Sequence, residues 1–318
     1  MRTFTKALVA LPFLAMAATA QTDYPTQPIT MVVGFSAGGG MDTLARLVAA
    51  ESTEHLGQQM VVENRPGAGG TIAGGYAANA RADGYTLFLG ETATLVGPVV
   101  HGNVGYDPLE SFFPVAQLTS APLALVAHPD FPASDMQGFI DLVRENPGEY
   151  FYASPGVATI QHLAVEQLAM DAGLEMDVVH FQGGTPSVTA VVSGEVPLGI
   201  VSLNAAVAQA EGGNLIVLGV TSAERVPGFD DIPAFGEVVP GFDAAPRMFV
   251  FAPAGVDETV QTRLRGMMAA IMDDEAFREG LVTRGFVVEY LDGPELAEQL
   301  PGLVESWSAT AETVLAND

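Results

Sequence analysis

Ser36 lies in the part of the chain that comes closest to a catalytic pattern. Residues 34–38 read Gly-Phe-Ser-Ala-Gly, which matches the G-x-S-x-G turn that exposes the nucleophilic serine of α/β-hydrolases. Those enzymes place several strands before the serine and a histidine late in the chain. Here an apolar strand is predicted to start as early as Ile29, and the last histidine is His180. A serine hydrolase is therefore the less favoured alternative, and we expect no enzyme and no catalytic residue.

The same loop has the composition of an anion-binding site. It follows the apolar run of residues 29–33 and precedes a helical pattern of apolar residues from Leu44 to Val48. N–H groups of small loop residues and of a helix's first turn attract anions, and the helix dipole adds to this attraction. The candidate ligand-binding residues here are Phe35, Ser36, Ala37, Gly38, Gly39 and Gly40. A tight turn without a ligand would need the same glycines.

Nucleotide-binding and metal-binding patterns are not met in the sequence. Residues 38–40 are three glycines followed by Met-Asp-Thr, so the spacing G-x-G-x-x-G fails, and Gly-Lys-Ser/Thr does not occur. The five histidines lack the spacing of metal ligands, and the chain has no cysteine. We therefore expect no cofactor and no metal.

The first twenty residues have the features of a secretory signal. Arg2 and Lys6 precede an apolar run, and residues 18–20 read Ala-Thr-Ala, a small-residue cleavage pattern. We predict cleavage near Ala20 and a location in the periplasm. The rest of the 318-residue chain suits one large or two medium domains and has no later stretch that reads as a membrane span.

The net charge of the chain is strongly negative. Its formal value is −26, and removal of Arg2 and Lys6 with the signal leaves 10 basic and 38 acidic residues, a net charge of −28. A field of this sign repels nucleic acid, which we exclude as a partner. It would also repel an anionic solute, so an anion site in this protein needs local N–H donors.

The strand–loop–helix pattern of residues 29–48 recurs three times. The later small-residue loops span residues 64–70, 154–159 and 182–185. Ligands of open α/β sheets bind at the carboxyl ends of strands, where such loops lie. The hydroxyls of Thr92 and Thr94 follow another apolar strand, and His162 lies in the first turns of the helix behind the third loop. We place all three side chains near the site.

Alternating strands and helices predict an α/β fold with mostly parallel sheets and flanking helices. Two apolar strands, at residues 122–127 and 248–252, are candidate crossover strands between two lobes. We therefore predict that residues 21–122 and 247–318 form the first lobe and residues 123–246 the second. The four small-residue loops would then face one another across a cleft.

Several longer motifs resemble one known family. Residues 63–70 read Glu-Asn-Arg-Pro-Gly-Ala-Gly-Gly, residues 83–87 read Asp-Gly-Tyr-Thr-Leu, and residues 252–255 read Ala-Pro-Ala-Gly. With these motifs, in order along nearly the whole mature chain, the sequence resembles the Bug-type substrate-binding receptors of tripartite tricarboxylate transporters. The resemblance implies a two-lobe "Venus flytrap" fold like that of type II periplasmic binding proteins.

The same resemblance implies a function and partners. A receptor of this kind captures a small organic acid, a mono-, di- or tricarboxylate, and delivers it to a large and a small membrane subunit. It has no bound metal and no catalysis, and we expect a monomer. A sensor that passes ligand occupancy to a signalling partner would use the same fold, and the sequence leaves this alternative open.

By position, the resemblance places ligand contacts on both lobes. The first lobe contributes the loop of residues 35–40 and the turn after the third strand. The candidates on the second lobe are Ser154, Val157, Thr159, His162, Gln182, Gly183, Gly184, Thr185 and Asn204. The family often has Tyr-Lys-Gly where this chain has Phe-Gln-Gly at residues 181–183. Arg247 is a candidate replacement cation that could pair with a distal carboxylate, and a surface arginine is the alternative.

Overall fold

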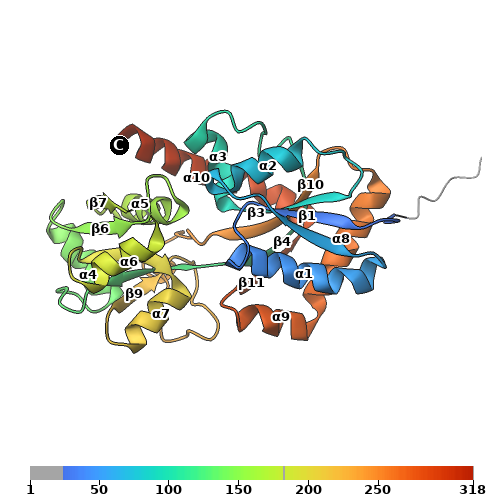
Figure 1. Ribbon diagram of the computed structural model, residues 1–318. Helices are drawn as coiled ribbons and strands as arrows, with labels where there is room; N and C mark the ends of the chain where they lie inside the picture. Colours follow the sequence, from blue (N-terminus) through green and yellow to red (C-terminus); the bar gives the residue numbers. More distant parts are fainter. Residues whose placement is uncertain (1–23, 182, 318) are drawn as a thin grey trace, which may run out of the picture.

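A computed structural model of the protein describes residues 24–181 and 183–317. The chain folds into two lobes, each built on one β-sheet with helices on both faces (Figure 1). The α/β two-lobe architecture predicted from the sequence is confirmed. The predicted signal segment lies outside the described residues.

The first lobe contains a six-stranded sheet in the order β11-β4-β10-β3-β1-β2. Its strands are β1 (Ile29–Val33), β2 (Met60–Asn64), β3 (Thr86–Glu91), β4 (Phe112–Ser120), β10 (Arg247–Pro253) and β11 (Val287–Asp292). One face packs against α1 (Gly40–Leu56), α8 (Glu258–Asp273) and α9 (Glu275–Val282). The other face packs against α2 (Thr71–Ala78), which follows the short helix η1 (Ala68–Gly70), α3 (Thr92–His101) and the start of α10 (Gly293–Asn317).

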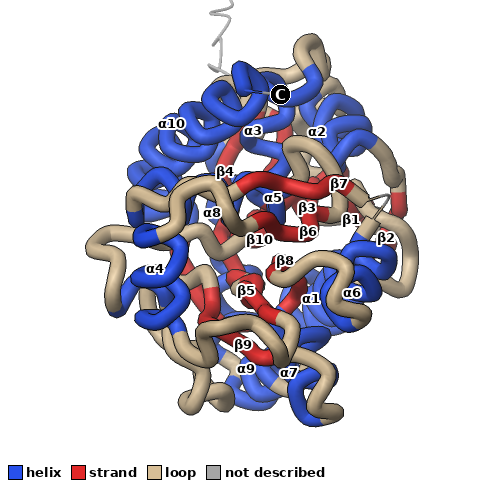
Figure 2. Tube along the Cα trace, turned by 90° about the vertical axis from the view of Figure 1, so that its left-hand side faces the viewer, coloured by secondary structure: helices blue, strands red, loops and turns tan. Residues whose placement is uncertain are grey.

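The second lobe contains a five-stranded sheet in the order β7-β6-β8-β5-β9. Its strands are β5 (Leu123–Ala127), β6 (Phe151–Ser154), β7 (Asp177–His180), β8 (Leu198–Ser202) and β9 (Ile216–Val220). Helices α4 (Met136–Glu145) and α5 (Ile160–Ala172) cover one face, and α6 (Gly184–Val192) and α7 (Leu203–Glu211) cover the other. Figure 2 looks onto this lobe and shows the strands enclosed between the helices. A short helix, η2 (Phe235–Glu237), precedes the return to the first lobe.

Both sheets are mixed, which corrects the expectation of mostly parallel sheets. In the first lobe β1 pairs in parallel with β2 and β3, while β10 runs antiparallel to β3 and β4, and β11 antiparallel to β4. In the second lobe β6 is parallel to β7 and β8, while β5 is antiparallel to β8 and β9. The cause lies in the connections, because β5 and β10 each enter from the other lobe. They therefore start at the edge where the parallel strands end.

Two short connections join the lobes and are bonded to each other. Ala121 N–H donates to Pro246 O at 2.8 Å. The crossings are thus the connections at residues 121–122 and 244–246, while the strands predicted as crossovers each lie within one sheet. Paired connections of this kind form a hinge.

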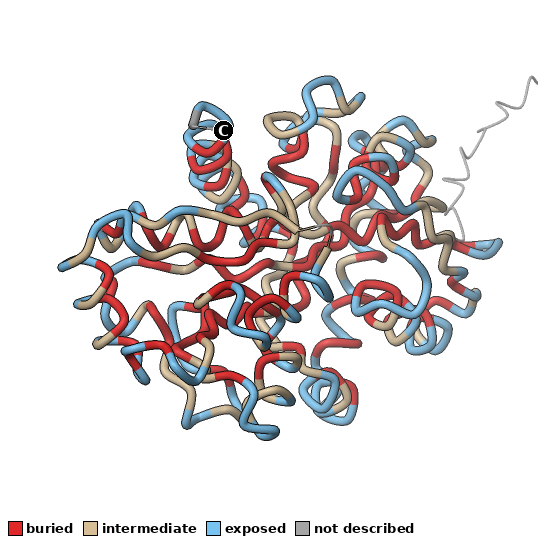
Figure 3. The backbone as a smooth tube through the Cα atoms, turned by 60° about the vertical axis from the view of Figure 1, so that its left-hand side comes forward, coloured by how far each residue is buried: buried red, intermediate tan, exposed pale blue. Residues whose placement is uncertain are grey.

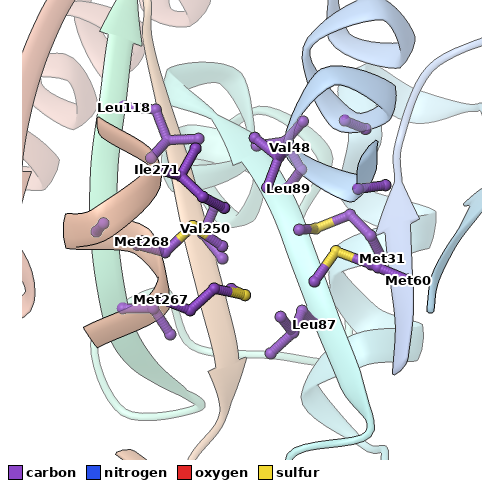
Figure 4. Packing of buried hydrophobic residues seen from close by; sticks show 14 of the residues in the cluster. Met31, Val48, Met60, Leu87, Leu89, Leu118, Val250, Met267, Met268 and Ile271 are labelled. Atoms are coloured by element: carbon purple, nitrogen blue, oxygen red, sulfur yellow. The ribbon is translucent and has the colours of Figure 1, made fainter. Parts of the chain in front are cut away.

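The core of the first lobe is rich in methionine. Figure 4 shows Met267, Met268 and Ile271 of α8 pointing toward the strands that carry Leu87, Leu89 and Val250. Flexible thioethers fill irregular gaps between the helix and the sheet. Figure 3 shows that the buried residues follow the strands and the inner faces of the helices in both lobes. Burial of these apolar side chains is the main stabilising contribution, since the chain contains no cysteine.

Helix α10 packs against both lobes. Its Leu296 and Leu300 belong to a core cluster of the first lobe, whereas Trp307, Ala311 and Val314 belong to a core cluster of the second. In Figure 1 the helix ends beside α5. We expected residues 247–318 to lie on the first lobe, but the helix continues through Pro301 and its apolar stripe extends to the second lobe.

Candidate functional site

A cleft of about 820 Å³ lies between the lobes, beside the hinge residues Ala121, Pro122 and Pro246. The first lobe contributes Phe35, Ser36, Ala37, Gly39, Gly40, Met41, Gly69, Glu91, Ala93, Met248, Arg284 and Phe286, among others. The second contributes Val157, Ala158, Thr159, Ile160, Gln161, Ser202, Leu203 and Asn204. The cleft therefore opens at the carboxyl ends of β1, β3 and β8, the edge expected for a ligand site.

The loop between β1 and α1 is held in place by its neighbours. A Cβ atom on Gly34 would collide with the Cα atom of Gly70, so this glycine allows the two loops of the lobe to approach closely. The buried Asp42 carboxylate accepts hydrogen bonds from Gly38 N–H at 2.8 Å, Arg46 Nε at 2.9 Å and Asn64 Nδ2 at 3.0 Å. The bonds from Arg46 and Gly38 lower the pKa of Asp42 to about 2. The loop is therefore fixed before any ligand arrives.

The first turn of α1 leaves N–H donors open to the cleft. Its N-cap is Gly39, which has no side chain to cap the helix. Among the described residues, no acceptor takes the N–H of Gly40 or Met41, and both residues line the cleft. The N-terminus of a helix with open amides carries partial positive charge. This wall can bind an anion without a lysine.

The turn between β3 and α3 is arranged differently from the prediction. Thr92 and Thr94 are buried and do not line the cleft. The Thr92 hydroxyl accepts from Arg247 N–H at 2.9 Å, and the Thr94 hydroxyl donates to Glu91 O at 2.6 Å. Both hydroxyls therefore hold the hinge and the helix start. The residues that face the cleft from this turn are Glu91 and Ala93.

Glu91 is the residue that our sequence analysis missed. It lies opposite Met248 in the pairing of β3 with β10, and both residues line the cleft. Burial raises the pKa of its carboxyl to about 7. The signal in the sequence was an acid directly before two threonines at a strand end. We did not select Glu91 because a ligand carboxylate needs hydrogen-bond donors, and an ionised carboxylate side chain has none.

On the second lobe, the start of α5 satisfies only some of its backbone N–H groups, because those of Ile160 and Gln161 have no acceptor among the described residues. Thr159 is the N-cap, and its hydroxyl accepts from His162 N–H at 3.3 Å and donates to Gly156 O at 2.9 Å. Ala158 N–H donates to His162 Nδ1 at 3.0 Å. Val157 and Thr159 line the cleft, while Ser154 is buried behind them and its hydroxyl bonds with Gly156. The residues of this turn that line the cleft are mainly apolar.

His162 faces away from the cleft, contrary to our expectation. Ile160 and Gln161 line the cleft, and the next helical position turns to the buried side of α5. There His162 borders a second cavity of about 660 Å³ together with Glu166. Its ring packs against His180 with 4.7 Å between centroids.

The loop before α6 contributes no described residue to the cleft wall. Gly183 N–H donates to Pro155 O at 3.0 Å, and Gly183, Gly184 and Thr185 are not among the residues that border the cleft. Gln182 lies outside the described residues. Asn204, in contrast, lines the cleft, and its side-chain amide donates to Arg284 O on the first lobe over 3.5 Å. Of the four predicted loops, those at residues 35–40 and 154–159 border the cleft from opposite lobes, and the loop at residues 64–70 adds Gly69.

Arg247 lies at the hinge rather than in the cleft. Its guanidinium pairs with Asp243 and lies 4.0 Å from Glu289. Pro246 and Met248 line the cleft, and successive side chains of a strand point to opposite faces. The geometry therefore gives no support to a ligand role for Arg247. Among the described cleft residues, Arg284 and His101 are the basic ones.

Two structural features are absent from residues 24–181 and 183–317. No helix in that part of the chain is both long and apolar enough to cross a membrane. No group of three His, Asp or Glu side chains there is arranged to hold a metal ion.

Comparisons with known proteins agree with this architecture. Residues 44–310 match the family model "Tripartite tricarboxylate transporter family receptor". BugT of Bordetella pertussis is 31% identical over 265 residues, which cover 82% of this chain and 81% of BugT. A solved R. palustris protein with adipate is 32% identical, has a TM-score of 0.75, and is matched over 92% of this chain and 98% of its own. MatC from Rhodopseudomonas palustris with bound malate is 29% identical, with a TM-score of 0.71, over 91% and 100% of the two chains.

Proposed function

This chain belongs to the tripartite tricarboxylate transporter receptor family, as its motifs indicated, and we propose that it is a periplasmic receptor that captures a small organic acid between its lobes. The observation that carries the proposal is the uncapped start of α1. Gly40 and Met41 offer N–H groups to the cleft that the described residues leave without acceptors. Relatives solved with adipate and malate support an acid as the ligand.

The hinge supplies a mechanism for signalling occupancy. A carboxylate bound at the first-lobe loop gains further contacts when the second lobe closes over it, so ligand shifts the population toward the closed form. Asn204 already contacts Arg284 O across the cleft, and this contact supports a mechanism in which the lobes close. We propose that the closed form is recognised by the two membrane subunits of a tripartite transporter. The receptor acts as a monomer in this scheme, and a signalling partner is the alternative reader of the same form.

A thermal unfolding screen of the mature protein tests the binding function. The panel contains adipate, malate, succinate and acetate, each at several concentrations, with sulfate as the anion control. A ligand at 100 times its dissociation constant adds about 2.7 kcal/mol to the free energy of unfolding. We expect at least one organic acid to raise the unfolding temperature in a saturable way. If no organic acid stabilises the protein at millimolar concentration, the proposal is wrong.

The hydrolase alternative is tested with the same preparation. Ser36 lines the cleft, so ester substrates are offered to the wild type and to Ser36→Ala. We expect no turnover above buffer in either protein. Turnover in the wild type that disappears in Ser36→Ala would replace the receptor function with catalysis.

A further inference from the structure

Glu91 places a carboxyl group in the wall of a cleft that is otherwise suited to an anion. The residue closes β3 and faces the same side of the sheet as Met248, its partner across β10. Among the described residues, no hydrogen bond or ion pair reaches the Glu91 side chain. Its oxygens are also absent from the buried polar atoms that lack partners. Glu91 is half-buried, and the cleft that it lines is the space its carboxyl opens on.

The charged groups around the cleft leave Glu91 without a fixed cation. Arg284, at the end of α9, is exposed and its Nη1 donates to Gly280 O at 2.7 Å in its own helix. His101, at the end of α3, is exposed. Behind the loop, Asp42 is an anion that already holds Arg46. No other described residue lining the cleft carries a titratable side chain.

Two charge arguments follow from this arrangement. An unpaired carboxylate in a partly desolvated wall is unfavourable, so Glu91 is expected either to take up a proton or to meet a cation. A ligand with two carboxylates would bring a second negative charge toward Glu91 and into a protein with a net charge of −26. A ligand that carries one positive group avoids both costs.

We propose that Glu91 determines ligand specificity by binding the ammonium group of an amino acid, whose carboxylate lies on the open N–H groups of Gly40 and Met41. This inference rests on the proposed function and narrows its ligand class from organic acids to amine-bearing acids. In this arrangement the ammonium group binds Glu91 at the end of β3, and the carboxylate binds the start of α1. Both groups belong to the first-lobe wall of the cleft. The other lobe closes over the carbon chain with Val157 and Leu203.

The test uses pairs of acids that differ only in the amine. Dissociation constants are measured by calorimetry at pH 8 for aspartate and succinate, and for glutamate and glutarate. We expect the wild type to bind the better amino acid at least tenfold more tightly than its amine-free partner, the size of one charged hydrogen bond. Glu91→Gln keeps the shape of the side chain and should reduce this preference to about twofold or less.

The pH dependence provides a second measurement. As pH rises from 6 to 8 the carboxyl of Glu91 loses its proton, since burial raises its pKa to about 7. Binding of the amino acid should therefore strengthen and binding of the amine-free acid should weaken in the wild type, while both profiles become flat in Glu91→Gln. The exposed Glu51→Gln on α1 makes the same acid-to-amide change outside the cleft, so it serves as the control and should keep the wild-type profiles.

The outcomes separate this inference from the proposed function. Tight binding of an amine-free acid at pH 8, with the same preference in Glu91→Gln, overturns the role of Glu91 and leaves the receptor function intact. Failure of every organic acid, with or without an amine, overturns both. Loss of the amine preference in Glu91→Gln, with an unchanged unfolding temperature of the free protein, supports Glu91 as a specificity-determining residue.

Discussion

The two walls of the cleft are built from the same strand–loop–helix unit but differ in how the start of the helix is capped. On the first lobe the N-cap of α1 is Gly39, and the N–H groups of Gly40 and Met41 have no acceptor among the described residues. On the second lobe Thr159 caps α5 with its hydroxyl, and His162 accepts from Ala158 N–H. The Thr159 cap satisfies one first-turn N–H group of α5 and leaves those of Ile160 and Gln161 without an acceptor among the described residues, whereas α1 has no side-chain cap at all.

This difference teaches which residue types separate a binding loop from a structural one. Both loops are small-residue turns at a strand end, and both line the cleft. The N-cap side chain occupies one first-turn amide of α5, and α1 has no such bond. We therefore assign carboxylate binding to the first lobe and closure to the second, and substitutions on each wall should have different effects.

Gly34→Ala should have the largest effect, because it acts on the wall that we assign to binding. The added Cβ would collide with the backbone of Gly70, which cannot move aside as a flexible side chain can. We expect a loss of about 3 kcal/mol in the free energy of unfolding, together with loss of acid binding. Chemical denaturation and calorimetry measure the two quantities.

The matched control for this prediction is Gly39→Ala in the same loop. Its Cβ would lie 3.5 Å from Ser36 O, an ordinary contact, and stability should stay within about 1 kcal/mol of the wild type. Equal destabilisation by both alanines would mean that neither glycine position tolerates a side chain. The close approach to Gly70 would then not be the cause.

Asp42→Asn should have the next largest effect, since the aspartate fixes the binding loop through Gly38. A pKa of about 2 in the folded protein, against 3.8 for the free side chain, corresponds to about 2 kcal/mol of stability at neutral pH. Because the folded pKa is lowered, this contribution is present above about pH 4 and is lost as pH falls toward 2. The stability gap between variant and wild type, measured by denaturation, should therefore close in acid.

The exposed Glu51 on the same helix provides the control for Asp42. Glu51→Gln should change stability by less than about 0.5 kcal/mol at any of these pH values. A gap for Asp42→Asn that persists at pH 2 would show that its carboxylate charge does not hold the loop.

Thr159→Val should have a smaller effect and a different kind, because it acts on the self-capped wall. Loss of the N-cap hydroxyl should cost about 1 kcal/mol of stability, whereas the dissociation constant for an organic acid should change by less than about threefold. Thr159→Ser retains the cap and should resemble the wild type. A tenfold loss of affinity in the valine variant alone would mean that the second lobe also binds the ligand through this hydroxyl, and the contrast between the walls would fail.

Arg247→Gln should have the smallest effect on recognition. The guanidinium is held by Asp243 at the hinge and does not face the cleft, so the ratio of dissociation constants for a dicarboxylate and its monocarboxylate analogue should stay within about twofold. Calorimetry with succinate and butyrate measures this ratio. A tenfold change of this ratio in favour of the monocarboxylate would support a role for Arg247 in binding a distal carboxylate.

The sequence predicted the two lobes and most strands because these elements are continuous apolar runs. Two strands were missed, β4 and β11. In β4 the buried residues include Gln117, Thr119 and Ser120, which hide the apolar pattern, and β11 is half-buried along its whole length. Polar residues inside a sheet are placed by tertiary contacts, which a single sequence does not contain.

The candidate site was predictable as a region but not side chain by side chain. The loop of residues 35–40 was found from composition, because small residues directly before a helix allow an anion to approach the backbone N–H groups. Thr92 and Thr94 were misassigned because a hydroxyl that bonds to the backbone and a hydroxyl that binds a ligand look the same in sequence.

Helix α10 has a consequence for how the molecule opens in solution. The last helix of a chain usually frays, and its amides then exchange with solvent before the core unfolds. Here Leu300 and Trp307, two turns apart, lie in the cores of different lobes. Detaching the helix exposes both cores at once, so its central amides should exchange as slowly as those of β10. We therefore expect the C-terminal helix to make the two lobes unfold as one cooperative unit.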